Sequence, residues 1–288
     1  MASHRHKHWT ADPTTVLRVG KGFRLDRTDP EATPGYHRRK RDSVDDLVAG
    51  SDELSDLQER LYASSRGESD AAGSVLLVLQ AMDTAGKGGI IRHVVGSVDP
   101  QGVQLAAFKK PTTEELAHDF LWRIRARVPE PGMIGVFDRS HYEDVLIGKV
   151  RSLAPDDEIE RRYGAIVDFE KELTDAGTRI VKVMLHISPR EQRDRLMERL
   201  DRPDKHWKYN PGDVDERKLW PEYMRAYQAV FDRTSTSNAP WYVVPANHKW
   251  YARLAVQSLL LSALLEIDPH WPAASFDVAT ERERLSAT

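Results

Sequence analysis

Between residues 75 and 89 the chain reads VLLVLQAMDTAGKGG. Its first five residues are apolar and partly β-branched, which is typical of a buried strand in a parallel sheet. A glycine-rich turn follows, and a helical pattern runs from Gly89 to Val98. This order predicts a phosphate-binding loop, because glycines let backbone N–H groups converge on phosphate oxygens and Lys87 adds a full positive charge.

The loop departs twice from the common phosphate-loop pattern G-x-x-x-x-G-K-[ST]. Ala81 replaces the first glycine, and Gly88 replaces the Ser or Thr that would ligate magnesium. Another group must therefore hold any metal ion. Asp83 is the candidate, since an acid inside an anion-binding loop needs a cation to neutralise it; the alternative is a solvated turn residue. The remaining loop contacts to phosphate are expected from Thr84, Ala85, Gly86, Gly88 and Gly89.

The rest of the chain alternates apolar runs with helical patterns, which predicts an α/β fold with a mainly parallel five-stranded sheet between helices. Strands are expected at 75–79, 103–108, 133–137, 179–187 and 241–244. Helices are expected at 45–66, 89–98, 112–127, 157–176, 189–200, 215–233 and 249–267. Residues 1–44 are interpreted as an irregular arm that wraps the domain or a partner subunit, and residues 45–288 as a single domain.

Composition limits the kind of partner. The chain has 42 basic and 45 acidic side chains, so it lacks the basic excess of a protein that coats nucleic acid, and any anion site is local. It contains no cysteine, which excludes disulfides, thiolate metal sites and cysteine nucleophiles. No apolar run approaches the roughly 18–20 residues that span a bilayer. We expect a cytoplasmic protein without a membrane partner. Its His4, His6 and His8 are expected to belong to a solvated tail, with metal binding by these alternating histidines as the alternative.

The ends of the predicted strands carry charged residues, and ligands of open α/β sheets bind beyond the carboxyl ends of the strands. Asp138 directly follows the third strand and resembles the acid that helps to hold magnesium in phosphate-loop enzymes. A helix N-cap is the alternative, although Ser140 or Asp144 would serve that purpose better. Arg139 comes next, and Lys109 follows the second strand. These acids and cations suit the chemistry of magnesium-bound phosphates.

A second group of cations lies between the fourth and fifth strands. Its members share one helix face or follow that helix closely: Arg195, Arg199, Arg202, Lys205 and Lys208. Acidic residues four positions before Arg195 and Arg202 make ordinary surface pairs the alternative. Arg199 has no acid four positions before it, and Lys205 and Lys208 lie beyond the predicted helix at 189–200. Because nucleotide kinases place a mobile lid here, we interpret residues 190–235 as a helical lid that closes over phosphates and excludes water.

From about Leu47 to Leu265 the sequence resembles the polyphosphate kinase 2 family. The most specific stretches are LQAMDTAGKGG at 79–89, residues 98–108 with their Pro-Gln-Gly turn, HDFLWR at 118–123, FDRSHYEDVL at 137–146 and KHWKYNPGD at 205–213. The resemblance implies a P-loop kinase-like fold and a reversible transfer of phosphoryl groups between inorganic polyphosphate and nucleoside mono- or diphosphates, with Mg²⁺ or Mn²⁺. It also implies a homodimer or homotetramer.

The resemblance implies roles for particular residues as well. Asp83 and Asp138 would handle the metal and activate the acceptor phosphate. Lys87 and Arg139 would bind and stabilise phosphoryl oxygens. This chemistry fits the residues, because phosphoryl transfer depends on positioning and charge neutralisation more than on covalent catalysis.

The remaining expected ligands would guide the polyphosphate chain or contact the nucleotide: Arg199, Arg202, Lys205 and Lys208 from the lid, with Lys109 and Tyr142 from the strand ends. The acceptors would be adenine nucleotides, AMP or ADP, with guanine nucleotides as a second option. The wording QAMDTAGKGG is closer to the family groups outside the one that acts on diphosphates alone.

Two other functions stay open on the sequence. An NTP-dependent nucleotide kinase would share the fold and the loop, but such enzymes usually keep Ser or Thr where this chain has Gly88. A non-catalytic polyphosphate-binding module would need the cations but not both acids, Asp83 and Asp138. Nucleic-acid binding is least favoured, because single-strand binders pair basic grooves with exposed stacking aromatics and only Trp207 and Tyr209 qualify.

Overall fold

The computed structural model describes residues 8–67 and 73–288. One sheet contains β1 (Ser74–Ala81), β2 (Val103–Ala107), β3 (Ile134–Asp138), β4 (Thr178–His186) and β5 (Trp241–Pro245). Its order is β2-β3-β1-β4-β5, and every neighbouring pair is parallel. The expected five-stranded parallel sheet is therefore confirmed, and β1, which leads into the phosphate loop, lies at its centre.

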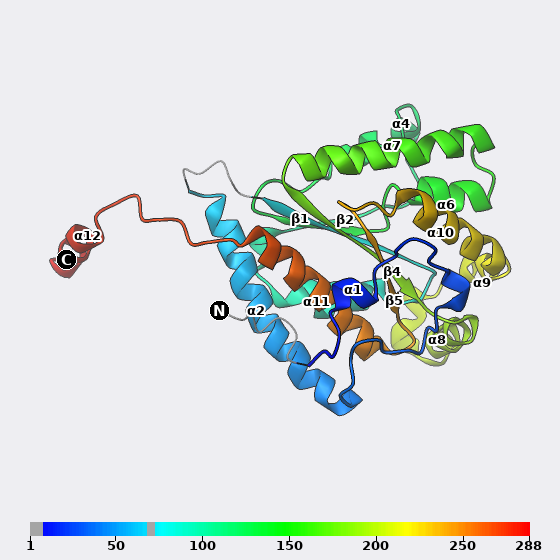
Figure 1. Ribbon diagram of the computed structural model, residues 1–288, viewed down its shortest axis with the longest axis horizontal. Coiled ribbons are helices and arrows are strands. Elements are labelled where there is room, and N and C mark those ends of the chain that lie inside the picture. The colour runs from blue at the N-terminus through cyan, green and yellow to red at the C-terminus, as the bar shows by residue number, and fades with distance from the viewer. Residues whose placement is uncertain (1–7, 68–72) are drawn as a thin grey trace.

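Helices cover both faces of the sheet (Figure 1). One face packs against α2 (Ser43–Ser64), α3 (Lys87–His93) and α11 (Lys249–Ile267), and the other against α5 (Trp122–Arg125), α6 (Glu143–Val150), α7 (Asp156–Asp175) and α10 (Trp220–Thr234). Side chains of β1 point alternately to the hydrophobic cores on the two faces of the sheet. Leu77 packs in the core on the α2 and α11 face, and Leu76 and Val78 pack in the core on the opposite face. A strand buried on both faces explains why β1 is apolar throughout.

Two helices expected as continuous are each divided in two. Residues 112–127 form α4 (Thr113–Leu116) and α5, and residues 212–234 form α9 (Gly212–Arg217) and α10. The first break occurs where the Asp119 carboxylate accepts the Leu121 backbone N–H at 3.0 Å, an alternative to a helical hydrogen bond. The second break precedes Pro221, whose ring is tolerated in the first turn of a helix and not inside one.

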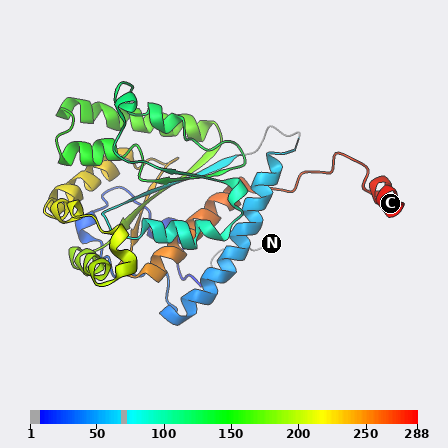
Figure 2. The ribbon, with the colours of Figure 1, turned by 180° about the vertical axis from the view of Figure 1, so that it is seen from behind.

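The remaining helices are short or lie at the edges of the domain: α1 (Pro13–Val16), α8 (Pro189–Asp201) and α12 (Val278–Ser286), with 3₁₀ turns at Leu25–Arg27, Lys40–Asp42, Val95–Ser97, Pro100–Gly102 and Pro203–Lys208. The sequence patterns did not predict α12. It lies apart from the body of the molecule, at the end of an extended segment (Figures 1 and 2). Its separation explains the absence of the apolar periodicity that packing would require.

The N-terminal arm packs on its own domain in the part that the structure describes. The Val19 N–H donates to the Trp241 carbonyl at 2.8 Å, and the Val243 N–H donates to the Leu17 carbonyl at 3.0 Å. The arm thereby pairs with β5 and covers an edge of the sheet that would otherwise be open. His8 lies 3.1 Å from Asp46, so it is paired and not part of a solvated tail; His4 and His6 lie outside the described residues.

The apolar helix α11 corrects one expectation. By length and composition it could cross a membrane, although the sequence analysis found no segment of that kind. In the fold, 72% of this segment is buried inside the protein, where it packs between the sheet and α2. Figure 2 shows α2 running diagonally along that face. The position of α11 is that of a core helix.

Packing of α2 against this core allows a direct test. We expect Leu61→Ala, at a fully buried position, to lower the free energy of unfolding by about 2–5 kcal/mol, because it removes buried methyl groups and leaves a cavity. Val48→Ala on the exposed side of the same helix, where the side chain is 57% exposed, should change it by less than about 0.5 kcal/mol. Urea unfolding of both variants measures the difference, and equal losses would contradict the packing described for α2.

Candidate active site

The loop after β1 has the backbone geometry of an anion cradle. Thr84 and Gly86 have positive φ values of 66° and 120°. These angles turn the chain sharply into α3, which begins at Lys87. A residue with a side chain is strained at φ 120°, so Gly86 cannot be replaced without cost. The N–H groups of Lys87 and Gly88 precede the first hydrogen bond of α3, which Gly89 donates to the Gly86 carbonyl at 2.8 Å, and unpaired N–H groups at a helix N-terminus favour an anion.

Arg195 holds the loop from behind. Its Nη1 donates to the carbonyl oxygens of Thr84 and Ala85 at 3.0 and 2.9 Å, and its Nη2 donates to those of Ala246 and Asn247 at 2.7 and 3.1 Å. One guanidinium thus joins the phosphate loop to the end of β5. Because the loop carbonyls point toward Arg195, they do not oppose an anion in the cradle.

The acid and the cation that follow β3 meet the loop directly. Asp138 pairs with Leu79 across the β3–β1 ladder, and the Arg139 N–H donates to the Leu79 carbonyl at 3.1 Å. Arg139 has a φ of 64°, an uncommon conformation for a residue with a side chain. This turn brings its Nη2 to 3.1 Å from the Asp83 carboxylate. Asp83, Asp138 and Arg139 therefore converge although 55 positions separate the two aspartates in the chain.

Arg139 keeps its charge in this setting. Burial alone would lower the pKa of its guanidinium, but the carboxylates of Glu143 and Asp83 outweigh burial and raise the pKa above the usual arginine value. Burial raises the pKa of Glu143 in turn, and the positive charges of Arg139 and Lys87 oppose that rise. The site therefore holds a permanent cation surrounded by carboxylates.

The phosphate loop opens into a cavity of about 550 Å³. Its lining is dominated by cations from several elements: Lys87, Arg92, Arg139, Arg195, Arg199, Arg202, Lys205, Lys208, Lys249 and Arg253. The acidic lining residues are Asp83, Asp138 and Glu198. Burial and the neighbouring Arg92 lower the pKa of Arg253, as expected for a cation without enough negative charge beside it. The cavity suits a ligand with several negative charges.

A second cavity of about 230 Å³ lies next to the first and shares Asp83 and Arg139 with it. Its other polar lining residues are Glu143, Asn210, Asp213, Glu216, Tyr223 and Tyr227. Burial, followed by the charge of Asp83, raises the pKa of Asp213 to about 6. Carboxylates accept hydrogen bonds from hydroxyl and amino groups, and tyrosine rings offer flat apolar surfaces. The pair Asp83–Arg139 is the common wall of an anion-binding cavity and of this mixed one.

The sequence model of a protein family described as Polyphosphate kinase 2 matches residues 41–270 of the chain. The chain belongs to the polyphosphate kinase 2 family. It is 45% identical over 250 residues to the AMP/ADP-polyphosphate phosphotransferase of Meiothermus ruber, with 87% of this chain and 91% of that protein covered. It is 42% identical over 279 residues to the ADP-polyphosphate phosphotransferase of Rhodopseudomonas palustris, with 90% and 92% covered.

A solved structure agrees with this assignment. The crystal structure of polyphosphate kinase 2 from Arthrobacter aurescens TC1 matches with a TM-score of 0.94 at 58% sequence identity, and the match covers 97% of this chain and 98% of that one. The expected family and the P-loop kinase-like fold are therefore confirmed.

Two carboxylates beside the loop could contribute to a metal site. Asp83 and Asp138 both line the larger cavity beside the phosphate loop. The described residues contain no group of three or more acidic or histidine side chains that could hold a metal without help. Mg²⁺ is typically bound by one or two carboxylates together with substrate phosphates and water, so the donor set fits that ion. Thr84 also lines this cavity, and its hydroxyl is buried without a protein partner.

The lid cations have more acidic partners than the sequence indicated. Arg199 lies 3.5 Å from Asp213 and donates to the Lys208 carbonyl at 2.8 Å, and Lys205 lies 3.1 Å from Asp204. Neither acid lies four positions before its cation, so helical spacing alone did not identify these two pairs. Arg202 and Lys208 also line the larger cavity, so all four lid cations reach it.

Two expected ligands lie elsewhere in the fold. Tyr142 is completely buried beneath the sheet, where its hydroxyl donates to Glu170 at 2.7 Å, and it lines neither cavity. Lys109 is exposed beyond the edge strand β2 and does not line them either. The sequence placed both near strand ends, but the burial of Tyr142 and the edge position of β2 depend on the tertiary fold.

Sequence reasoning missed Arg92 and Arg253 and misjudged Arg195. Arg92 lies on α3 beyond the phosphate-loop motif and Arg253 lies on α11, and the packing of these two helices brings both side chains to the cavity. Arg195 was grouped with the lid cations because of its helical spacing. Its side chain is only 6% exposed, however, and donates hydrogen bonds to the backbone carbonyls of the loop. Its pairing with Glu191 at 2.6 Å was foreseen as a surface pair.

The role of Arg195 predicts a specific defect. Arg195→Ala should leave four loop and strand-end carbonyls without their charged donor, and we expect at least tenfold weaker binding of tripolyphosphate together with about 3–5 kcal/mol lower stability. Isothermal titration calorimetry and urea unfolding measure both quantities. Arg193→Ala, at an exposed position of the same helix, is the control and should leave both near the wild-type values. Wild-type binding by Arg195→Ala would contradict a supporting role for this guanidinium.

Proposed function

We propose that this protein transfers a phosphoryl group between inorganic polyphosphate and an adenine nucleotide, AMP or ADP. The observation that carries the proposal is the common wall formed by Asp83 and Arg139, at which a cationic cavity meets a smaller mixed cavity. A transferase for two anionic substrates needs adjoining sites and a cation where they meet. The names of the relatives, which act on polyphosphate with AMP, ADP or both, support these two substrates.

In the proposed reaction, the polyphosphate chain lies in the cationic cavity with its terminal phosphoryl group at the phosphate loop. A phosphate oxygen of the nucleotide attacks the terminal phosphorus, and the bond from that phosphorus to the next bridging oxygen breaks. The shortened polyphosphate leaves as the anion, and the nucleotide gains one phosphate. Lys87 and Arg139 neutralise charge on the oxygens of the transferred group, which favours the transition state because that charge is spread over these oxygens.

A divalent cation, Mg²⁺ or Mn²⁺, is part of this proposal. Asp83 and Asp138 would hold it, because both carboxylates line the larger cavity beside the loop and Gly88 offers no hydroxyl ligand. When bound, the ion would neutralise phosphate charge. The chain's own contribution is to hold Asp83 against Arg139, so that the carboxylate stays oriented.

Within residues 190–235, the segment expected to form a lid, we propose that the end of α8, the turn Pro203–Lys208 and α9 move, because α10 is packed in the core against the sheet. The cations of α8 and the following turn line the larger cavity, and α9 and α10 carry residues of the smaller one. Closure would exclude water and bring the positive charge of Lys205 and Lys208 toward the polyphosphate. Exposed Trp207 lies beside Lys208, whose ammonium is 4.8 Å from the ring centroid.

The first experiment resolves nucleotides by chromatography after incubation with Mg²⁺ and either AMP or ADP, with and without polyphosphate. We expect ADP or ATP to form only when polyphosphate is present, and the faster reaction identifies the preferred acceptor. Transfer from ATP to AMP without polyphosphate would instead identify an ordinary nucleotide kinase. Binding of polyphosphate without any product would indicate a non-catalytic module.

Asp83 gives a sharper test of the site. Asp83→Asn keeps the shape of the side chain but removes the charge that faces Arg139 and a bound cation, so we expect kcat to fall at least about 100-fold with the melting temperature nearly unchanged. Asp52→Asn on the exposed surface of α2 is the control. Turnover of Asp83→Asn within a few-fold of the wild type would remove the role assigned to this carboxylate.

The lid cations predict a defect that depends on donor length. Replacing Lys205 and Lys208 together by Ala should raise the KM for long polyphosphate about tenfold, leave the KM for the nucleotide nearly constant and weaken the salt dependence of the reaction. Lys171→Ala together with Lys218→Ala, two exposed lysines outside both cavities, is the matched control. Unchanged kinetics with long chains would assign the lid lysines to surface pairs.

A further inference from the structure

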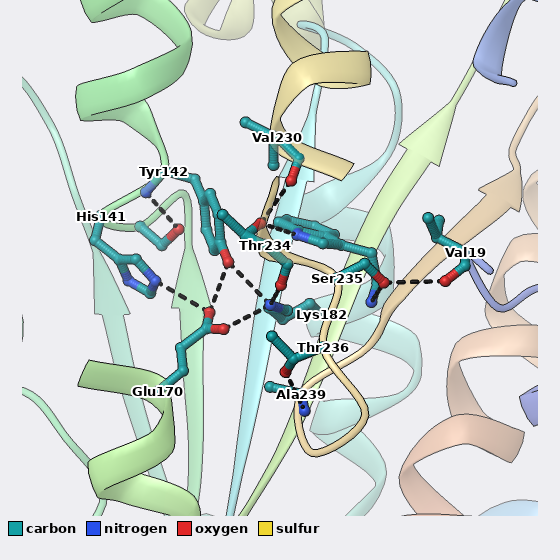
Figure 3. Close-up of polar contacts among 12 residues, drawn as sticks. Val19, His141, Tyr142, Glu170, Lys182, Val230, Thr234, Ser235, Thr236 and Ala239 are labelled. Atoms are coloured by element: carbon teal, nitrogen blue, oxygen red, sulfur yellow. Dashed lines mark hydrogen bonds and ion pairs between the residues drawn. The ribbon is translucent and has the colours of Figure 1, made fainter. Parts of the chain in front are cut away.

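A buried polar cluster lies beneath the candidate active site. Its members are His141, Tyr142, Glu170, Lys182 and Thr234 (Figure 3). Their side chains come from the segment after β3, from α7, from β4 and from the end of α10, and all five residues are at most 2% exposed. None of them lines either cavity of the site. They do not touch substrate, so any effect on the reaction must pass through other residues.

Lys182 is the centre of the cluster, and each of its three ammonium hydrogens has an acceptor. Its Nζ donates to Glu170 at 2.6 Å, to the Thr234 carbonyl at 2.7 Å and to the Tyr142 hydroxyl at 2.9 Å. Tyr142 donates its own hydroxyl hydrogen to Glu170 at 2.7 Å. The three side chains therefore form a closed ring of short contacts, which defines one orientation for each of them.

The charge state of Glu170 supports this geometry. Burial pushes the pKa of its carboxyl upward, but Lys182, with His141, outweighs burial and lowers the pKa below the usual value. Glu170 is therefore an anion that accepts from Lys182, Tyr142 and, at 3.4 Å, from His141 Nε2. A buried ion pair adds little stability compared with well-packed apolar residues of the same size, so stability alone is a weak reason for this one.

The cluster is continuous with the residues of the common wall. Asp138 and Arg139 come directly before Ser140, and the Ser140 Oγ accepts from the Tyr142 N–H at 3.2 Å and from Gln80 Nε2 at 3.1 Å. Arg139 has its uncommon φ of 64° in this turn. A residue in a left-handed conformation persists only when its surroundings define it strongly. The anchors that follow it are His141 and Tyr142, both held by Glu170.

We propose that the Glu170–Lys182 ion pair is a positioning device: through Tyr142 and His141 it fixes the turn that aims Arg139 at Asp83 and at the transferred phosphoryl group. This inference rests on the proposed function for its catalytic part. A displacement of about 1 Å at a catalytic group can cost on the order of 100-fold in rate, so a rigid anchor two residues away has a direct kinetic value.

Tyr142→Phe tests the anchor with the smallest change. It keeps the ring against Trp241, whose centroid lies 4.7 Å away, and removes only the hydroxyl that joins Glu170 and Lys182. We expect kcat to fall about tenfold while the KM values for polyphosphate and nucleotide change by less than about twofold, because binding groups outside the turn are untouched. Tyr163→Phe, at a buried tyrosine of α7 beside Arg233, is the matched control and should keep the wild-type kcat.

A double variant separates positioning from stability. Glu170→Leu combined with Lys182→Met removes both charges and keeps the volume, so the melting temperature should stay near or above that of the wild type. We expect its kcat to be at least as low as that of Tyr142→Phe. Wild-type kcat in either variant would overturn the proposal, and so would an equal loss in Tyr163→Phe, since that would indicate a general effect of core substitution.

Hydrogen–deuterium exchange provides a readout that does not require activity. In Tyr142→Phe, backbone amides of residues 138–146 should exchange faster than in the wild type, while those of α2 stay unchanged. Unchanged exchange in residues 138–146 would overturn the positioning role even if transfer were confirmed. Faster exchange in a protein that shows no transfer from polyphosphate would instead contradict the proposed function and leave the anchoring of the turn standing.

Discussion

The site depends on the hydrogen bonds that the Arg195 guanidinium donates to the phosphate loop and to the end of β5. A phosphate loop can present its N–H groups to an anion only if its carbonyl groups find donors elsewhere, and Arg195 supplies donors to two of them. The same side chain binds the end of β5, so the loop and the neighbouring strands are fixed as one body. The cavity, the aspartates and the lid are arranged around a loop that this contact holds in shape.

Charge is distributed so that the site is strongly cationic in a chain with a net charge of −3. Ten cations line the larger cavity, whereas Asp83, Asp138 and Glu198 are its acidic residues. Several of these cations have acidic partners, as Arg202 has with Glu198 at 3.3 Å, but the cations of the lining outnumber its acids. The local electrostatic potential of the larger cavity is therefore positive, although the net charge of the chain is slightly negative. At the common wall of the two cavities, the neighbouring carboxylates hold the Arg139 guanidinium in place.

The sequence predicted those features of the fold that depend on a short run of neighbouring residues. The apolar run of β1 and the glycines after it predicted the strand, the loop and the parallel sheet, because burial on both faces and left-handed turns demand particular residue types. It failed for Tyr142, which was assigned to the ligand from its place after β3. The end of β3 brings Asp138 and Arg139 to the cavity, but the chain then turns into the core. There the Tyr142 hydroxyl donates to the buried Glu170, and the spacing of residues in the sequence cannot predict that contact.

The sequence by itself determined the architecture of this protein, its central loop and the two aspartates beside it, because strand periodicity, glycine conformation and strand-end position are properties of short segments. Only the tertiary structure decided which cations reach the phosphate cavity, that Arg195 faces the loop and not the solvent, and that Glu170 and Lys182 meet beneath Arg139. These contacts join residues from different helices and strands, and their distances depend on how the two layers of helices pack against the sheet.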